Sequence, residues 1–191
     1  MTENSVYQPT DGQRVHLYRA KIKNPAPTMD PRWHWVEGGY VKHICRQVCV
    51  LGDDRVNPED IKHLIVRSGF ADWNMPRSLE AIEIDVDTLC EFTEMLDVDG
   101  NPIFENAIVE FPGDIIFDDD EMGPCMGHEH VRARVSRQNG RWELVGPKTV
   151  DKAVMLTPES QSALMAIFKI CRVVGNYIDH HDLFEDAKNN T

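Results

Sequence analysis

The chain has 191 residues, enough for one ordinary domain with a hydrophobic core or for one domain with tails. It carries 20 Lys and Arg against 32 Asp and Glu, a net charge of −12. The acidity belongs to one segment, because residues 78–131 contain 16 acids and no Lys or Arg. This largely excludes binding of a nucleic-acid backbone by the protein as a whole, which needs clustered Lys and Arg.

The composition also bears on the compartment. No apolar run approaches the roughly 20 residues that a membrane-spanning helix needs. The polar start of the chain lacks the apolar segment of a secretory signal. Five cysteines, an odd number without dense spacing, are typical of reduced thiols rather than of a disulfide framework. The sequence therefore predicts a cytoplasmic protein without membrane contact.

The first third of the chain predicts an arm followed by strands. Residues 1–13 lack periodicity and indicate a flexible N-terminal arm. Residues 15–22 alternate between apolar and polar side chains and predict a strand. Residues 33–41 are aromatic and β-branched but contain Gly38 and Gly39, so we expect two strands around a turn or bulge.

Turn signals separate the elements of the middle segment. Asn57 before Pro58 marks the start of one helical turn or more. Residues 81–85 alternate as a strand does. Residues 97–102 (DVDGNP) are a strong turn signal. Strand-like runs follow this turn at residues 103–105 and 107–111.

The last third predicts a hairpin, a short helix and a strand. The Asn-Gly dipeptide at 139–140 lies between the alternating residues 131–137 and 142–145 and predicts a β-hairpin. The Thr-Pro dipeptide at 157–158 marks the start of a short helix, and we expect a strand over 169–174. Many short strands with one or two short helices predict a mainly β protein, a small barrel or a sandwich.

A metal site is one interpretation of the residues just before this hairpin. Cys125, His128 and His130 are residue types that bind zinc, and His128 and His130 share a face if the segment is extended. His180 and His181 are candidates to complete the site. The alternative is a polar loop that leads into the strand, because no established zinc-binding spacing is present.

Four adjacent acids stand out within the acidic segment. Asp118, Asp119, Asp120 and Glu121 lie in a predicted loop over residues 118–124. Such a run binds a divalent cation or a basic partner surface, or is only a solvated loop. Adjacent side chains in an extended loop point in alternating directions, which disfavours a shared ion. We therefore treat the four acids as candidates for contact with a partner.

The predicted hairpin carries the opposite charge. Arg132 and Arg134 share a strand face, and Arg141 lies across the turn from them, with Arg137 nearby. These arginines form either a small basic patch that binds nucleic acid or a solvated face that balances the acidic segment.

Four segments taken together resemble YopX-like phage proteins. They are residues 17–21 (LYRAK) with 35–41 (WVEGGYV), residues 84–93 (IDVDTLCEFT), residues 97–111 (DVDGNPIFENAIVEF) and residues 173–178 (VVGNYI) with Leu183 and Phe184. The third segment is the most diagnostic, and the order matches that of the family. The chain departs from the family pattern at Asn106-Ala107 and at Cys90-Glu91, where the family has Gly-Asp and Gly-Gln.

The resemblance implies an SH3-type small barrel core with extra strands and hairpins, encoded by a phage or prophage. It implies no activity, because the family has no established catalytic residues. It also implies structural roles for the motif residues. These are Asp97, Gly100, Ile103, Phe104, Glu105, Ile108, Val109, Gly175 and Asn176. Asn106 replaces a glycine, and asparagine tolerates a left-handed backbone better than most residues.

These observations predict a single YopX-like domain over residues 14–186, followed by a tail over 187–191. We expect a non-enzymatic module without a cofactor, which binds a host or phage protein in the cytoplasm of a bacterial host cell. One variant of this hypothesis is an acidic mimic of DNA. The alternatives are a zinc protein or enzyme centred on Cys125, His128 and His130, and a nucleic-acid-binding module. The sequence leaves a homo-oligomer open.

Overall fold

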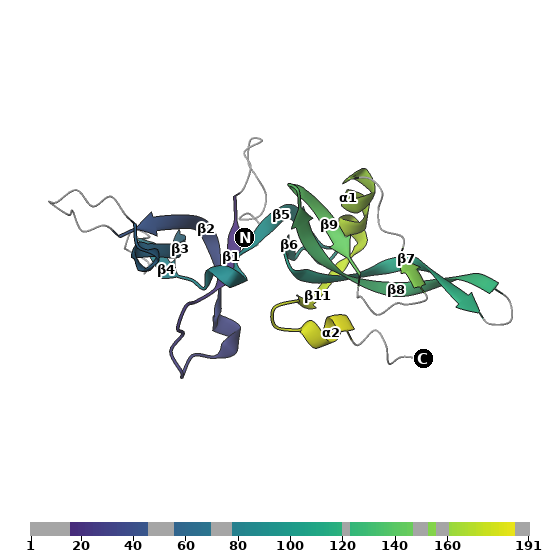
Figure 1. The fold of residues 1–191 in the computed structure, drawn as a ribbon, viewed down its shortest axis with the longest axis horizontal. Helices are drawn as coiled ribbons and strands as arrows, with labels where there is room; N and C mark the ends of the chain where they lie inside the picture. Colours follow the sequence, from purple (N-terminus) through teal and green to yellow (C-terminus); the bar gives the residue numbers. More distant parts are fainter. Residues whose placement is uncertain are drawn as a thin grey trace. The chain divides into compact units, whose positions relative to one another are not determined.

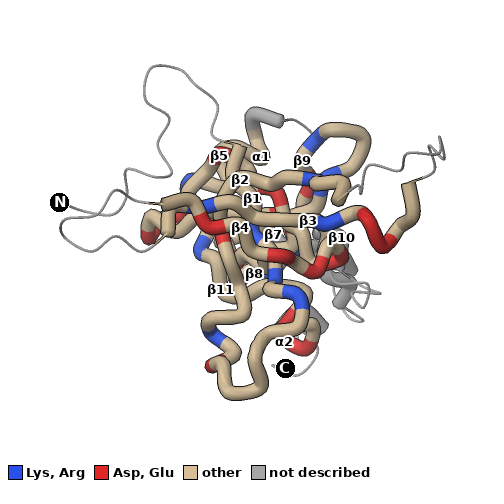
Figure 2. The backbone as a smooth tube through the Cα atoms, turned by 90° about the vertical axis from the view of Figure 1, so that its left-hand side faces the viewer, with Lys and Arg blue, Asp and Glu red and all other residues tan. Residues whose placement is uncertain are grey.

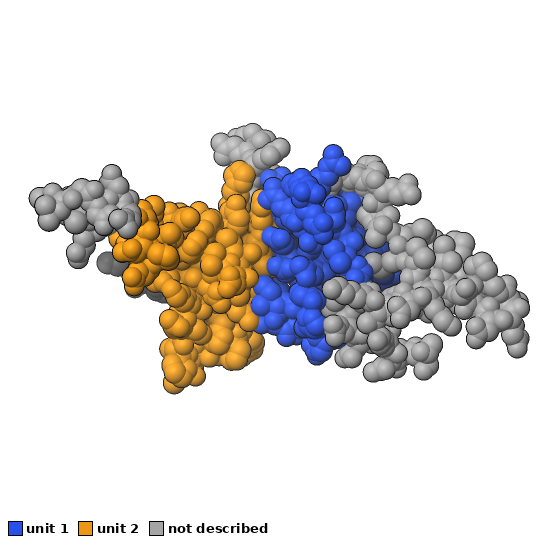
Figure 3. All heavy atoms as spheres, viewed as in Figure 1, with its two compact units in different colours: residues 1–15, 92–191 blue, residues 16–91 orange. Residues whose placement is uncertain are grey.

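The structure is a computed structural model that describes residues 16–45, 56–69, 78–119, 123–146, 153–155 and 161–185. It confirms that the protein is mainly β, and it shows two antiparallel sheets and, in the described part, two α-helices (Figure 1). The chain divides into two compact units, which carry different colours in Figure 3. Unit 2 comprises residues 16–91, and unit 1 comprises residues 92–191 together with 1–15. Neither described helix is long and apolar enough to cross a membrane.

Unit 2 is an antiparallel meander of four strands. In sheet order the strands are β4 (Leu79–Glu83), β3 (Ile61–Ser68), β2 (Trp35–Ile44) and β1 (Tyr18–Lys21). The first residues of β5 (Cys90–Leu96) pair with β1 on its other side. The helical turn expected after Asn57 is confirmed as one 3₁₀ turn, Pro58–Asp60, which leads directly into β3.

The end of β4 returns to the end of β1. Ile84 forms a bridge with Ile22. The Lys23 N–H donates to the Glu83 carbonyl at 3.0 Å, and the Asp85 N–H donates to the Lys21 carbonyl at 2.9 Å. A 3₁₀ turn at Val86–Thr88 (η4) then carries the chain into β5. The strands of unit 2 therefore curl so that the last strand of the meander meets the first.

The prediction of two strands around a turn or bulge at Gly38 and Gly39 is wrong. β2 runs without a break through both glycines. A Cβ atom at Gly38 would lie 2.4 Å from the carbonyl oxygen of Val66 in β3, closer than Cβ atoms approach other heavy atoms in proteins. Gly38 therefore allows two strands to approach closely, and it does not end a strand.

One face of the unit 2 sheet forms the core of that unit. Its buried members are at most 3% exposed and are Ala20, Val36, Ile65 and Ile84. Tyr18, Ile22, Tyr40, Ile82 and Leu89 pack against them and stay partly exposed. The alternating pattern of each strand buries these residues on one face and leaves the other face for solvent or a partner.

Unit 1 is built on a long hairpin of β7 (Ala107–Asp119) and β8 (Gly123–Gln138). β9 (Arg141–Val145) pairs with β8. Along the other side of β7 lie β10 (Ala153–Met155) and β11 (Arg172–Asn176). The end of β5 pairs with β6 (Pro102–Phe104). The helices are α1 (Gln161–Ile170) and α2 (His181–Glu185).

Of the predictions for unit 1, the hairpin is confirmed and the strand after α1 starts later than expected. The hairpin at Asn139-Gly140 is confirmed, and both residues adopt positive φ angles of 50° and 77°, as a two-residue hairpin turn requires. α1 extends to Ile170, so the strand that we expected from residue 169 starts only at Arg172, and α2 was not predicted.

Two loops were expected, over residues 118–124 and over the polar residues that lead to Val131; both predictions are wrong except at residues 120–122, which lie outside the described residues. Asp118 and Asp119 belong to β7, and the segment with Cys125, His128 and His130 belongs to β8. Residues 115–117 (Ile-Ile-Phe) have strong strand character, and they pair with both β8 and β10. Pairing on both sides therefore extends β7. Because β8 pairs with this extended part of β7, its polar residues also form a strand.

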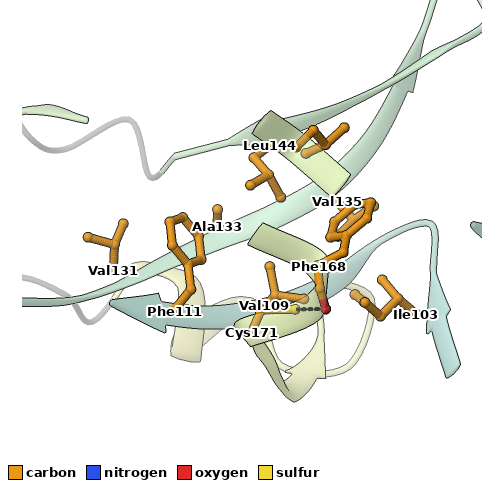
Figure 4. Packing of buried hydrophobic residues seen from close by; sticks show 11 residues of the cluster. Ile103, Val109, Phe111, Val131, Ala133, Val135, Leu144, Phe168 and Cys171 are labelled. Atoms are coloured by element: carbon orange, nitrogen blue, oxygen red, sulfur yellow. Dashed lines mark hydrogen bonds between the residues drawn. The ribbon is translucent and has the colours of Figure 1, made fainter. Parts of the chain in front are cut away.

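α1 covers the core of unit 1. Leu164 and Phe168 of the helix pack on Val109, Val135 and the other buried residues of the sheet (Figure 4). Cys171 follows the helix and is fully buried in the same cluster. Burial, with a smaller contribution from the charge of Asp97, raises the pKa of the Cys171 thiol to about 11. This thiol is therefore protonated and unreactive at neutral pH.

Glu94 occupies a strained position in an irregular part of β5. Its φ angle is 65°, a left-handed conformation that costs a residue with a side chain about 1–2 kcal/mol. The side chain is exposed, so it packs against no core. The β5–β6 register shifts between Phe92 and Leu96, and the Thr93 hydroxyl holds the irregular strand by donating to the Ile103 carbonyl at 2.8 Å.

We expect Glu94→Gly to raise the free energy of unfolding by about 1 kcal/mol, because glycine adopts this conformation without steric cost. Urea denaturation measures the change. Glu94→Ala is the matched control, since it removes the same carboxylate but keeps a Cβ atom. An equal gain from alanine would show that charge, and not backbone strain, limits stability at this position.

Candidate interaction site

The diagnostic segment begins with a buried carboxylate that organises a turn. Asp97 is 6% exposed, and its carboxylate accepts hydrogen bonds from the backbone N–H groups of Asp99 (2.9 Å), Asn101 (2.7 Å) and Val173 (2.9 Å). The Asn101 side-chain amide donates a fourth bond at 3.1 Å. Burial opposes ionisation, but these bonds outweigh it and hold the pKa of Asp97 below its usual value. Asp97 thus ties the β5–β6 turn to β11.

The remaining motif residues also serve the backbone. Gly100 has a φ angle of 83°, and Asn106 has one of 63°, so asparagine does adopt the left-handed conformation expected of it. The Asn106 N–H donates to Val135, and its carbonyl accepts from the Tyr177 N–H, both at 2.8 Å. Ile103, Phe104, Ile108 and Val109 are at most 2% exposed. These contacts are structural.

The C-terminal motif makes a similar junction. A Cβ atom at Gly175 would lie 3.3 Å from the Leu183 side chain and 3.4 Å from the His180 ring. The buried Asn176 side chain accepts from the Ile178 N–H at 2.8 Å. Gly175 and Asn176 therefore shape the turn that places α2 against β8.

The arginines of the hairpin fall on two faces. The β7–β8–β9 register places Arg132, Arg134 and Arg141 on one face of the sheet and Arg137 on the other. Arg132 forms an ion pair with Glu110 at 3.0 Å and donates to the Leu183 carbonyl at 3.4 Å. Arg141 remains exposed.

Arg134 holds the C-terminal turn against the sheet. Its guanidinium lies 4.4 Å from the centre of the Tyr177 ring, which also contacts His181 at 4.7 Å. Glu105 is near this cluster, and burial raises the pKa of its carboxyl although the charge of Arg134 opposes the shift. The two central arginines of the expected basic patch thus contact other parts of unit 1.

The expected metal ligands lie at strand positions in β8. Cys125 is opposite Phe117, His128 is opposite Asp114, and His130 is exposed opposite Pro112. Positions 128 and 130 fall on one face of β8, and position 125 falls on the other. His180 accepts a hydrogen bond from the Asn176 N–H at 3.3 Å within the C-terminal turn. The side chains of Cys125 and His128 lie outside the described part, and among the side chains that the structure describes, no three potential ligands cluster around one point.

The acidity belongs mainly to unit 1. Residues 16–91 carry 12 Asp and Glu and 10 Lys and Arg, whereas the rest of the chain carries 20 and 10. Both signs are interspersed along the described backbone (Figure 2). Asp118 and Asp119 lie in β7, while Asp120 and Glu121 lie outside the described residues. Unit 2 is therefore close to neutral.

The sequence analysis missed an apolar surface on unit 2, which we call the outer stripe. It runs across β2, β3 and β4 on the face opposite the core, where Val41 pairs with Leu64, Val66 pairs with Ala81, and Ser68 pairs with Leu79. The stripe comprises Val41, Leu64, Val66, Leu79 and Ala81. Leu79 is 76% exposed and Val41 is 42% exposed, while Leu64 and Val66 are half-buried. The signal was three successive apolar residues, 64–66 (Leu-Ile-Val), which put apolar side chains on both faces of β3.

Charged and aromatic side chains border the outer stripe. Glu83 pairs with Lys23 at 2.8 Å and with Lys62 at 3.6 Å at one end of the sheet. On the same face of β1 and β2, Arg19 and Lys21 lie over the Trp35 ring at 4.7 Å and 5.5 Å from its centre. The border is thus polar, and its charges are paired within the unit.

Comparison of the chain with protein-family models, with curated proteins and with solved structures found no match. The candidate site therefore stands on its own geometry, an exposed apolar stripe with a polar border on a nearly neutral unit.

Proposed function

We propose that the protein is a non-enzymatic module that binds a host or phage protein through the outer stripe. The observation that carries the proposal is the exposure of Val41 and Leu79 on a sheet face whose centre is apolar. A contiguous exposed apolar patch with a polar border is typical of a protein-binding surface. Acidic mimicry of DNA is less well supported, because this surface lies on the nearly neutral unit.

We further propose that unit 2 is an SH3-type barrel and that the chain is a YopX-like protein of a phage or prophage. The order of the strands supports the fold, since β5 starts alongside β1 after a four-stranded meander and a 3₁₀ turn. The bonds between the ends of β4 and β1 are what a closing barrel needs. The positions of Asp97, Asn106 and Gly175 at backbone junctions agree with structural roles for the family motif.

The charges at the border of the stripe pair with one another within unit 2, which favours an apolar partner over a charged one. Lys23 and Lys62 share Glu83, so neither is poised to contact a phosphate backbone. Binding would then be driven by burial of apolar area.

The test compares Val41→Asp/Leu79→Asp with the wild type as bait for lysate of the bacterial host. A captured protein is then purified, and its affinity for each variant is measured by calorimetry. We expect the double substitution to weaken binding at least tenfold, because it places two charges in an apolar contact. Capture should persist at 1 M salt, where electrostatic contacts are screened.

Val98→Asp is the matched control, because Val98 is 57% exposed in unit 1 and outside the stripe. It should leave the affinity unchanged. The proposal fails if the control and the double variant lose binding equally, or if the wild type captures no protein at low salt or at 1 M salt. A partner that is lost only at high salt would instead favour the acidic segment.

A further inference from the structure

β9 forms one edge of the unit 1 sheet, and β10 and β11 lie along the opposite side of β7. Just before β11, the Cys171 carbonyl accepts from the Val98 N–H at 3.0 Å, and within β11 the Val173 N–H donates to the Asp97 carboxylate. The Asp97 turn thus bonds to the start of β11. β9 pairs with β8 on one side, and no described backbone group bonds to its other side.

The hairpin turn determines which groups of β9 face outward. In a two-residue hairpin the residues that flank the turn, here Gln138 and Arg141, bond to each other, and bonding then alternates along the strand. Glu143 and Val145 therefore bond to β8, as Arg141 does. The N–H and C=O groups of residues 142 and 144 point away from the sheet and can pair with another strand.

The exposed charges of β9 are complementary to themselves. Arg141 and Glu143 are both exposed and lie two residues apart on one face of the strand. In an antiparallel pair of β9 strands centred on Trp142, Arg141 of each copy lies opposite Glu143 of the other, so two favourable pairs form.

The other registers that pair the outward groups are less favourable. A pair centred on residue 143 places Glu143 opposite Glu143 of the other copy. A pair centred on Leu144 places Glu143 opposite Val145, which offers no charge. We propose that β9 joins β9 of a second copy of this chain, antiparallel and centred on Trp142, in a two-fold symmetric dimer.

The two-fold register favours a second copy over an unrelated strand, because one short strand supplies both halves of the charge pattern. A five-residue strand gives a small interface, so we expect a weak dimer with a Kd on the order of 100 µM. This self-association is independent of the outer stripe, which lies on unit 2.

Sedimentation equilibrium of the full chain between about 10 µM and 1 mM tests the dimer. Arg141→Glu makes both exposed positions acidic, and Glu143→Arg makes both basic, so each single variant should weaken the dimer at least tenfold. The double variant Arg141→Glu/Glu143→Arg should restore it to within a few-fold. An equimolar mixture of the two single variants should form a heterodimer at least as tight as the wild-type dimer.

Lys169→Glu is a control charge reversal at an exposed position of α1 and should leave the dimer unchanged. Circular dichroism checks that each variant folds. Slowed exchange of the Trp142 and Leu144 amide protons at high concentration would place the contact at β9. The proposal is overturned if the wild type stays monomeric at 1 mM, or if the single variants dimerise as it does. It is also overturned if the charge swap fails to restore the dimer, or if only Val41→Asp/Leu79→Asp abolishes it.

Discussion

Asp97→Ala is expected to lower the free energy of unfolding by about 4 kcal/mol. Each hydrogen bond to a buried charged group contributes roughly 1.5–3 kcal/mol, and alanine leaves three backbone N–H groups and one amide without their acceptor. Urea denaturation followed by circular dichroism measures the loss. Because Val173 is among the donors, the amide protons of β11 should also exchange faster in this variant.

The same carboxylate makes stability depend on pH. The pKa of Asp97 is lower in the folded protein than in the unfolded chain, so its contribution is present above the unfolded value of about 4 and is lost as the pH falls through the folded value. The difference in the free energy of unfolding between the wild type and Asp97→Asn should therefore become smaller as the pH is lowered from 6 towards 3.

Asp99→Asn is the matched control for Asp97. Asp99 lies in the same turn and pairs with Arg172 at 2.6 Å, but both side chains are exposed. Its loss should cost at most about 1 kcal/mol, as for other surface ion pairs. Equal losses at the two positions would contradict the idea that the buried carboxylate organises this turn.

Gly38→Ala is expected to lower the free energy of unfolding by about 3 kcal/mol. The added methyl group would meet the Val66 carbonyl at 2.4 Å and the Ile65 side chain at 2.9 Å, so β2 and β3 must move apart. Gly39 provides the comparison next to it, because a Cβ atom there meets only the Val66 carbonyl, at an ordinary 3.9 Å.

Gly39→Ala should therefore change stability by no more than about 0.5 kcal/mol. Thermal melting of the two variants side by side separates close packing from backbone flexibility. If both glycines mattered equally, flexibility in β2 would be the common cause, and the close approach to Val66 would not explain Gly38.

Local chemistry explains which elements could be predicted from the sequence. The turns at Asn139-Gly140 and at Asp97–Gly100 depend on residues within four positions of one another, so their signals are complete in a short window. Gly38 required knowledge of Val66, which lies in another strand. The alternation of residues 15–22 and 81–85 predicted strands for the same local reason.

The candidate site depended on contacts between distant segments. Arg134 is a basic residue on an alternating strand, and nothing nearby in the sequence indicates that Tyr177 will lie against it. The polar residues before Val131 indicated a loop, but pairing with β7 made them a strand. The outer stripe was missed because apolar residues in a strand were assigned to the core by default, and register decides which face they take.

The bond between Asp97 and Val173 joins positions 76 residues apart in the chain, and this separation has a consequence for synthesis on the ribosome. All strands of the unit 2 meander precede residue 84, so that unit can form while the rest is still being translated. Unit 1 lacks its last strand, and Asp97 lacks the one donor that lies outside its own turn, until Val173 has emerged. We therefore expect the side of β7 that pairs with β11, and the turn at Asp97, to complete their hydrogen bonds last during translation.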